Sequence, residues 1–412
     1  MEPSVGRPER TKSVRLHSGA PFWLLNDGLE ELGRPGSPPE SADVVVIGAG
    51  ITGALVADGL SAEGLSVVVL DRRAPACGST AASTSLLTYE LDIRLVELSR
   101  MIGESQAARA YRVSQAAVHD LASIASTLPE PVGFARSPSI LLATKRQDTK
   151  RLQEEAAWRQ RYDLDAEYWP PGQVEQTYGL PSYGAIHTGT AGLLDPVRFT
   201  RALLRRAISR GAQVLSRNPA RDVRPEGRGL IVATDHGSTR ARWVVYAMGY
   251  EMPPELRAGM VALHSTYALV TEPLDDLGPW KGACMVWETA RPYGYMRPTE
   301  DGRVMIGGAD MPFKDPAWRD RFMPDRTRRL EKQLRKWLPT LETQTAFTWA
   351  GTFGETRDGL PYIGPLASCP QALYALGYGA NGITFGAVAA RIVRDLCMGR
   401  PNDDVELFRL DR

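Results

Sequence analysis

The chain alternates between short apolar runs and longer segments in which apolar residues recur with helical spacing. The runs DVVVIG (43–48) and SVVVLD (66–71) are almost wholly apolar, which is typical of buried parallel strands. Between them, ITGALVADGLSAEG (51–64) has the pattern of a helix that ends at a glycine. These three segments predict a strand–helix–strand unit of about 30 residues.

The same two patterns continue through the rest of the chain, without a repeat of fixed period. Helices are predicted for residues 91–125, 145–163, 324–339 and 383–399, and a helix that runs into a strand for residues 195–215. Strands are predicted for residues 136–144, 229–234, 241–249, 265–273, 293–298, 303–310 and 373–379. This mixture predicts an α/β fold.

The N-terminal part follows neither pattern. Residues 1–32 carry one apolar patch, PFWLL (21–25), and the Pro- and Gly-rich GRPGSPPESAD (33–43) reads as a linker. The first residues are charged and lack the apolar core of a secretory signal. We expect Phe22 and Trp23 to pack on the domain that follows, while the role of residues 1–32 stays open.

Charge and composition exclude several classes of partner. The 412 residues include 49 Lys and Arg against 48 Asp and Glu, so a net charge of +1 gives no support for a nucleic-acid or anionic-membrane partner. The apolar runs 44–57 and 374–390 are too short for a comfortable membrane span. The four cysteines form no C-x-x-C pair and favour a cytoplasmic location. Five scattered histidines predict no metal site.

The first glycine motif has the context that dinucleotide binding requires. Gly48, Gly50 and Gly53 follow a predicted strand and open a predicted helix. Gly48 permits the tight turn, Gly50 lets the backbone approach a pyrophosphate, and Gly53 allows close packing of helix on strand. Asp71 ends the next strand, 18 residues after Gly53, where it would accept hydrogen bonds from a ribose. The helix N-terminus would bind the phosphates.

A second match to G-x-G-x-x-G, Gly377 to Gly382, is not a second dinucleotide site. The chain ends 30 residues after Gly382, where only VELFRL (405–410) resembles another strand, and no acid ends it. These glycines are better explained as letting the backbone pass close to a flat group. After Asp71, the hydroxyl-rich loop 72–92 suits a pyrophosphate and a flavin ring, although composition alone does not decide between FAD and NAD.

Seven motifs in this order carry a resemblance to a known family: DVVVIGAGITG…VVVLDRR, GSTAAST, LLDPVRFTRALLRRAISRGAQVL, VVYAMGYE, RVMIGGAD, GTFGETRDGLPYIGP and ALGYGANGITFG. From about Asp43 to Gly399 the chain resembles the FAD-dependent amine oxidoreductases of the D-amino-acid oxidase and glycine oxidase superfamily. Within it, the chain resembles the gamma-glutamylputrescine oxidoreductase-like branch. The resemblance implies an FAD-binding Rossmann-like domain built from discontinuous segments and a substrate domain with a mainly antiparallel sheet.

The resemblance places the domain boundaries and the cofactor contacts. We expect the FAD-binding domain in residues 43–130, 191–255 and 350–400, the substrate domain in 131–190 and 256–349, an extension and linker in 1–42, and a tail in 401–412. The implied FAD contacts are Gly48, Gly50, Ile51, Thr52, Gly53, Asp71, Arg72, Ser79, Thr80, Ser83, Leu86, Val223, Ala247, Gly249, Gly379, Asn381, Gly382, Ile383 and Thr384. Val223 would meet the adenine, and the helix that begins near Asn381 would stabilise the reduced flavin.

Departures from the family pattern are as informative as the matches. Relatives that oxidise amino acids hold the substrate carboxylate with arginines at positions that appear here as Phe353 and Ala380, which argues against a simple α-amino acid. Arg297 could replace them or lie on the surface. Relatives with covalent flavin use residues that match Gly351 and Ala82, so we expect non-covalent FAD. Met305 stands where sarcosine oxidases have a lysine.

Aromatic residues are expected to wall the substrate site, because such a wall attracts an amine cation. The candidates are Tyr267, Trp287, Tyr293, Tyr295, Trp349 and Phe353, of which we select Tyr295, Phe353, Tyr267 and Trp287, together with Arg297, as catalytic-site residues. Any single aromatic of this kind is more often core than site. His264 and Glu288 are weaker candidates for contact with the substrate amine.

The predicted activity is oxidation of the C–N bond of a primary or secondary amine to an imine, by hydride transfer to flavin N5. The electron acceptor is dioxygen or an unknown carrier. Two alternatives stay open: a biosynthetic flavoenzyme that acts on a larger tailored substrate, and a flavin-binding assembly factor without turnover. A filled substrate pocket would favour the assembly factor. The sequence does not decide the substrate, oxidase against dehydrogenase, or the oligomeric state.

Overall fold

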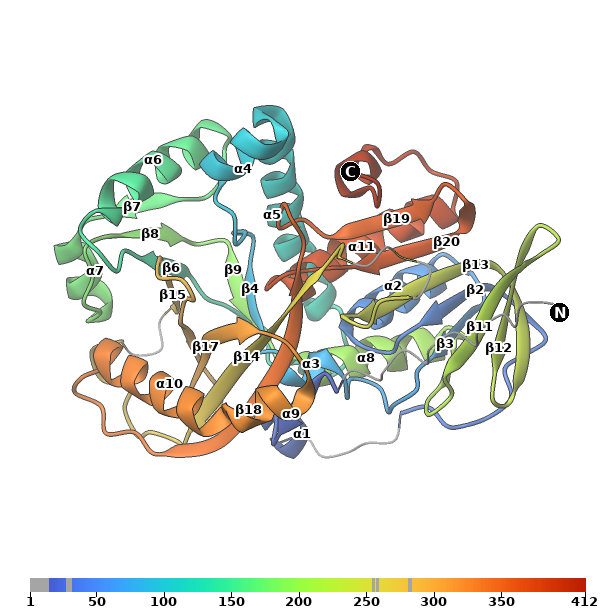
Figure 1. The fold of residues 1–412 in the computed structure, drawn as a ribbon, viewed down its shortest axis with the longest axis horizontal. Coiled ribbons are helices and arrows are strands. Elements are labelled where there is room, and N and C mark those ends of the chain that lie inside the picture. Colours follow the sequence, from blue (N-terminus) through green and yellow to red (C-terminus); the bar gives the residue numbers. More distant parts are fainter. Residues whose placement is uncertain (1–14, 27–31, 254–255, 257–258, 281–283) are drawn as a thin grey trace, which may run out of the picture.

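The structure is a computed structural model that describes residues 15–26, 32–253, 256, 259–280 and 284–412. Two large β-sheets, one rich in parallel pairs and one mainly antiparallel, organise these residues (Figure 1). The expected α/β class with a second, mainly antiparallel sheet is confirmed.

The first large sheet contains the strand–helix–strand unit predicted from the N-terminal glycine motif. Along the sheet, the order is β10 (Gln213–Leu215), β3 (Val67–Leu70), β2 (Ser41–Ile47), β13 (Gly237–Gly249), β12 (Gly229–Thr234) and β11 (Ala220–Glu226). A branch adds β20 (Cys369–Leu376), parallel to β13, and β19 (Tyr362–Leu366), antiparallel to β20. The last four residues of β2 and all of β3 are buried, because helices cover this sheet and both strands consist largely of valine.

The second large sheet forms the other half of the molecule. Among the described residues its order is β1 (His17–Gly19), β18 (Thr345–Glu355), β14 (Ala262–Thr271), β17 (Val304–Pro312), β16 (Tyr295–Pro298), β15 (Met285–Glu288), β6 (Ser139–Leu142), β8 (Ala185–Thr188) and β7 (Glu167–Trp169). All neighbours are antiparallel except β15 and β6. A small third sheet, β4 (Leu86–Thr88), β9 (Ala191–Leu193) and β5 (Ala135–Arg136), lies between the two large sheets in Figure 1.

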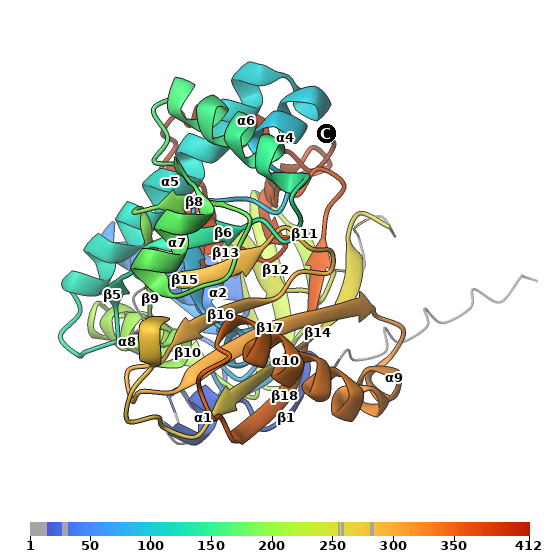
Figure 2. The same ribbon diagram turned by 90° about the vertical axis from the view of Figure 1, so that its left-hand side faces the viewer.

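Helices cover both sheets (Figure 2). Those that pack together beside the first sheet are α2 (Ile51–Ala62), α5 (Glu104–Ser126), α8 (Pro196–Ser209) and α11 (Gly382–Cys397). Those associated with the second sheet are α6 (Asp148–Arg161), α7 (Pro171–Tyr178), η1 (Gly278–Trp280), α9 (Pro316–Arg321) and α10 (Met323–Trp337). The remaining elements are α1 (Phe22–Asn26), α3 (Ser79–Ala82), α4 (Leu95–Ile102) and η2 (Asp403–Phe408).

The structure differs from the sequence prediction at two places. The helix predicted for residues 91–125 is two helices, α4 and α5, because Gly103 between them has a left-handed φ of 89°. Residues 403–408 form the 3₁₀ helix η2 rather than a strand at 405–410. The expected boundary at residue 350 stays a prediction, and it falls within strand β18, which runs from the second sheet to the cavity.

The described part of the N-terminal extension is built into the fold. Strand β1 pairs with β18, and Phe22 and Trp23 of α1 are buried in a cluster that includes Trp349. The Trp23 indole Nε1 donates a hydrogen bond to the Ser83 carbonyl at 2.7 Å. Phe22 and Trp23 therefore lie between the second sheet and the segment after β3.

Candidate cofactor and substrate site

The turn between β2 and α2 requires its glycines. Gly48 has a φ of +116°, and a Cβ there would lie 2.3 Å from the Ala247 carbonyl oxygen. A Cβ on Gly53 would lie 1.8 Å from the Gly48 carbonyl oxygen, so this glycine permits the close approach of helix and strand. Gly50 caps α2 without a side-chain hydrogen bond, and a Cβ there would meet only the Thr80 hydroxyl. The N-terminus of α2 therefore presents backbone to the space beside the turn.

Asp71 follows β3 on the same edge of the sheet. Its two carboxylate oxygens accept hydrogen bonds from the backbone nitrogens of Ala49 and Arg73, each at 2.7 Å. Burial raises the pKa of Asp71, and the two backbone hydrogen bonds oppose that shift. Arg72 and Arg73 both contact the Glu251 carboxylate, which positions them at this end of the site.

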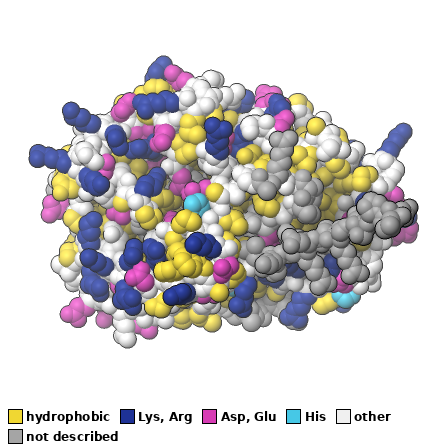
Figure 3. Space-filling view, in the orientation of Figure 1, with side chains coloured by type: hydrophobic (Ala, Val, Ile, Leu, Met, Phe, Trp, Pro, Cys, Tyr) yellow, Lys and Arg dark blue, Asp and Glu magenta, His cyan; other side chains and the backbone are white. Residues whose placement is uncertain are grey.

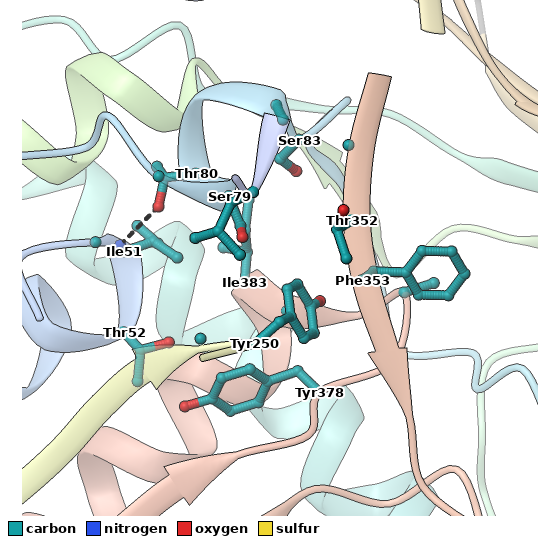
Figure 4. A pocket seen from close by; sticks show the side chains of 18 of the residues that line it. Ile51, Thr52, Ser79, Thr80, Ser83, Tyr250, Thr352, Phe353, Tyr378 and Ile383 are labelled. Atoms are coloured by element: carbon teal, nitrogen blue, oxygen red, sulfur yellow. Dashed lines mark hydrogen bonds between the residues drawn. The ribbon is translucent and has the colours of Figure 1, made fainter. Parts of the chain in front are cut away.

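Helix α3 lies opposite the first turn. The Thr80 hydroxyl accepts a hydrogen bond from the Ile51 backbone nitrogen at 3.0 Å (Figure 4). The Ser79 hydroxyl is shielded from solvent and has no hydrogen-bond partner among the described residues. Trp349 Nε1 donates to the Ala82 carbonyl at 2.9 Å and holds the end of α3. A buried hydroxyl without a partner suits a bound polar ligand.

The turn between β20 and α11 approaches the same space. Gly377 and Gly379 have positive φ values of 73° and 57°. The Asn381 side chain donates to the Glu90 carbonyl at 2.6 Å, and the Thr384 hydroxyl donates to the Thr88 carbonyl at 3.0 Å. These bonds fix the N-terminus of α11 against the segment that follows β4.

One cavity joins both glycine turns and α3. Most of the residues predicted to contact FAD line it: Gly48, Gly50, Ile51, Thr52, Asp71, Arg72, Ser79, Thr80, Ser83, Leu86, Ala247, Gly249, Gly379, Asn381, Gly382 and Ile383. Gly53 and Thr384 are outside this lining, and the contacts above show that they shape the two turns. Figure 4 shows α3, β18 and the start of α11 facing one another across the cavity.

Val223, predicted to meet the adenine, is not among the residues that line the cavity. It lies on β11, paired with Val232 of β12, while Pro219 and Ala220 line the cavity. The strand register shifts between Ala220 and Asp222. The position that faces the cavity is therefore Ala220, three residues before the predicted one.

The far end of the same cavity is walled by aromatic side chains. Trp287, Tyr293, Tyr295 and Phe353 line it, as do Thr266 and Asp310. The Trp287 and Tyr293 ring centroids are 5.9 Å apart, and those of Tyr293 and Tyr295 are 5.8 Å apart. Burial raises the pKa of Tyr295 to about 12, so its hydroxyl stays neutral.

The structure does not bring Tyr267 or Arg297 to this chamber. The Tyr267 hydroxyl donates to the Arg319 carbonyl at 2.9 Å, and its ring lies in the core on the other face of the sheet. The Arg297 guanidinium is buried and donates to the carbonyls of Thr84, Ser85 and Leu194. Arg297 therefore stabilises the loop before β4, and burial lowers its pKa to about 9.

The two weaker candidates for contact with the substrate amine, His264 and Glu288, lie in different places. His264 lies 3.4 Å from the Glu355 carboxylate and lines an adjoining second cavity. Glu288 is buried, accepts hydrogen bonds from Gly294 and Gln333, and lies outside both cavities. Met305, at the place of the lysine in sarcosine oxidases, is buried in the cluster that contains Phe22 and Trp23.

Sequence reasoning missed two acids in the chamber. Asp310 ends the apolar strand RVMIGGAD, and Asp92 is the last residue of the loop predicted to contact the flavin. An acidic residue at the end of an apolar strand can be seen in the sequence. Its place in the chamber depends on neighbouring residues from three other segments of the chain.

The residues that line the cavity fit FAD. It extends from the dinucleotide turn, past the partnerless Ser79 hydroxyl, to a glycine turn at the N-terminus of α11. Gly351 and Ala82, the positions of covalent attachment in some relatives, both line it, and a Cβ on Gly351 would lie 3.5 Å from that of Ala82. Cysteine and histidine are both absent from the lining, as far as the structure describes it.

The described residues include no helix long and apolar enough to cross a membrane. They also contain no group of three or more His, Cys, Asp or Glu side chains that could hold a metal ion.

Comparisons with known proteins agree with this geometry. Glycine oxidase from Bacillus licheniformis is 24% identical over 392 residues, which cover 90% of this chain and 97% of the relative. Gamma-glutamylputrescine oxidoreductase from Escherichia coli K12 is 24% identical over 409 residues, covering 94% and 88%. The crystal structure of glycine oxidase from Geobacillus kaustophilus superposes with a TM-score of 0.75 at 19% identity and covers 91% of this chain and 99% of its own.

L-proline dehydrogenase from P. horikoshii superposes similarly, with a TM-score of 0.76 at 20% identity, covering 90% of this chain and 98% of its own. At these identities the structural likeness shows the fold. The family model described as FAD dependent oxidoreductase matches residues 43–396, most of the chain. With the two glycine turns, the cavity between them and this match in place, the chain belongs to the family of FAD-dependent oxidoreductases that includes D-amino-acid oxidase.

Proposed function

We propose that the chain binds FAD non-covalently and oxidises the C–N bond of a primary or secondary amine to an imine, which water then hydrolyses. When bound, FAD supplies the acceptor for the hydride that leaves the amine carbon, at N5 of its ring. Dioxygen or an unknown carrier would reoxidise it. Glycine oxidase and gamma-glutamylputrescine oxidoreductase, both matched along most of their length, act on compounds with an amino group, as their names state.

The observation that carries this proposal is the aromatic chamber that continues from the cofactor cavity. Trp287, Tyr295 and Phe353 can hold an amine by cation–π attraction and keep water from the reacting carbon. Arg72 and Arg73 are the only cations in the described lining of this cavity, and both contact Glu251 at the dinucleotide end. A substrate carboxylate would therefore find no guanidinium in the chamber.

The open chamber also favours an enzyme over an assembly factor, because a factor without turnover would be expected to have a filled pocket. Asn381, Gly382 and Ile383 place the N-terminus of α11 at the cavity. A helix N-terminus stabilises negative charge on a bound group by about 0.3–2 kcal/mol. This arrangement would favour the reduced, anionic state of a flavin there.

An absorption spectrum before and after acid precipitation tests the cofactor part of the proposal. Colour that moves to the supernatant as FAD supports non-covalent binding, whereas colour that stays with the pellet contradicts it. Anaerobic titration with primary, secondary and γ-glutamylated amines then tests the reaction. Loss of the visible flavin band supports amine oxidation. A flavin that no amine reduces would favour the larger tailored substrate or the assembly factor.

A further inference from the structure

Asp310 lies where two cavities meet. Together with Asp92, Tyr293 and Phe353 it lines both the aromatic chamber and the adjoining second cavity. Near the middle of the face drawn in Figure 3, acidic side chains gather beside a histidine and hydrophobic side chains. The second cavity has the same mixture, with Glu355 and His264 on its wall.

One carboxylate oxygen of Asp310 has no hydrogen-bond donor. Its Oδ1 is shielded from solvent and has no partner within the described part of the chain. Thr266 hydrogen-bonds to the Asp310 carboxylate but leaves Oδ1 without a donor, and a polar atom that is shielded from solvent without a partner is destabilising. Asp310 lines both cavities, so a small rotation of its carboxylate would present Oδ1 to a ligand bound there, and that ligand can supply the missing donor.

The groups around Asp310 make the region acidic. Asp92 accepts hydrogen bonds from the Tyr293 hydroxyl at 2.7 Å and from the Ala380 backbone nitrogen at 3.4 Å. Glu355 lies 3.4 Å from His264 on the other side of the second cavity. These neighbours leave the Asp310 Oδ1 atom itself unpaired.

The single arginine of the second cavity does not neutralise this cluster. Arg291 is exposed, its guanidinium lies over the Tyr293 ring at 4.9 Å, and it donates to the Asp92 backbone carbonyl. Burial first, and then the charges of Asp92 and Glu355, raise the pKa of Asp310 to about 7, while the hydrogen bond from Thr266 and the charge of Arg291 act in the opposite direction. The hydroxyls of Tyr293 and Tyr295 stay neutral at this pH because their pKa values are raised.

We propose that Asp310 binds the ammonium group of the substrate and accepts its proton. The substrate class is then an alkylammonium ion with a hydrogen on the carbon beside nitrogen and without an adjacent carboxylate. This inference rests on the proposed function and names the substrate-binding residue. One proton moves from the ammonium nitrogen to Oδ1, which leaves a neutral amine with a free lone pair and a neutral carboxylic acid. No electron moves in this step.

The pH dependence follows from the proton that Asp310 must be free to accept. Below its pKa the carboxylate is protonated and can neither attract the ammonium ion nor take up its proton. The kcat/KM for an amine should therefore rise as pH increases through about 7, by about tenfold per pH unit on the acid side. If Asp310 had a purely structural role, kcat/KM would not show this rise through pH 7.

The test uses FAD-loaded protein and tert-butylammonium, a probe that cannot be oxidised because its carbon beside nitrogen bears no hydrogen. Pivalate, which has the same shape and the opposite charge, is the matched control ligand. Binding is read from the shift of the flavin spectrum and from thermal unfolding. Wild type should bind the cation and reject pivalate, with about tenfold weaker binding one pH unit below the pKa of Asp310 than one unit above it.

Substitution then locates the effect. Asp310→Asn should weaken binding of the cation about 10- to 100-fold and remove the pH dependence, and Asp310→Glu should restore part of both. Glu342→Gln removes one acid outside both cavities and should change neither. If Asp310→Asn fails to fold, the wild-type pH dependence and the comparison with pivalate still decide.

The outcomes separate this site from the proposed function. Asp310-dependent binding of the cation, in a protein whose flavin no amine reduces, would support the site and contradict the function. Reduction by amines that is equal in wild type and Asp310→Asn, with the same pH profile, would overturn the site and leave the function standing. Tighter binding of pivalate than of the cation would also overturn it.

Discussion

Gly50→Ala should separate cofactor binding from folding. Gly50 has φ −79° and ψ −174°, which any residue adopts, and its Cβ would meet only the Thr80 hydroxyl at 3.1 Å. The protein should therefore fold with at most about 1 kcal/mol lost, through the hydrogen bond between Thr80 and Ile51. The new methyl group would occupy the cavity beside the N-terminus of α2, where we place the pyrophosphate.

The expected effect on FAD follows from the hydrogen bonds that the methyl group would displace. A hydrogen bond from a backbone N–H to a charged group contributes about 1.5–3 kcal/mol. Loss of one such bond weakens FAD binding roughly 10- to 140-fold, because 1.4 kcal/mol corresponds to a factor of ten. The assay is titration of apoprotein with FAD, followed by quenching of flavin fluorescence, beside thermal unfolding of both apoproteins.

Two variants of the same helix are controls. Gly59→Ala, with nothing within 4 Å of the added Cβ, should leave FAD affinity unchanged and stabilise α2 by about 0.5–1 kcal/mol. Gly53→Ala should prevent folding, because its Cβ would lie 1.8 Å from the Gly48 carbonyl oxygen. A folded Gly50→Ala protein whose FAD affinity stays within about threefold of wild type would refute the placement of the phosphates at this turn.

Three further substitutions test the residues around the chamber. Arg297→Met should lower the free energy of unfolding by about 3 kcal/mol, since three buried carbonyls lose their donor, and any increase in KM without lost stability would show substrate binding instead. Tyr267→Phe should lower stability by about 1 kcal/mol, measured by denaturant unfolding, and leave kcat/KM unchanged; a large fall in activity would place its hydroxyl at the substrate. Gly307→Ala would bring a Cβ within 2.5 Å of the Tyr295 ring, so steady-state kinetics should show about a 100-fold lower kcat/KM at unchanged FAD affinity; wild-type kinetics would show that Tyr295 does not position the substrate.

The dinucleotide turn could be predicted from the sequence because its signals are local. Gly48, Gly50 and Gly53 follow one another within a single strand–turn–helix unit, and Asp71 lies at the end of the next strand, so their spacing can be recognised without knowledge of distant segments. The second glycine motif was interpreted correctly as a turn for the same reason.

The errors arise where the packing of a strand decides which side chain faces the cavity. Neighbouring side chains of β14 alternate between its two faces, and Thr266 lines the chamber while Tyr267 faces the opposite core. On β11, Ala220 lines the cavity and Val223 does not. Which face or end of a strand meets the cavity depends on packing against other segments and leaves no clear mark on the sequence.

The sequence also does not show how far along a strand the cavity extends. Tyr295 and Arg297 share a face of β16, because side chains alternate along a strand. Two residues span nearly 7 Å, and this is enough to carry Arg297 beneath the Ser85 loop while Tyr295 stays in the chamber. The pairing of β1 with β18 is a further long-range feature that could not be predicted from the sequence of residues 17–19.

The most direct test of the central claim is anaerobic titration of the FAD-loaded protein with amines, each paired with the amino acid that carries an additional carboxylate on the reacting carbon. We expect at least one amine to bleach the visible flavin band, and its carboxylated counterpart to bleach it far less, because the chamber contains Asp310 and Phe353 in place of a carboxylate-binding arginine. Bleaching by the amino acid at lower concentration than by its amine, or no bleaching by any amine, would contradict the account.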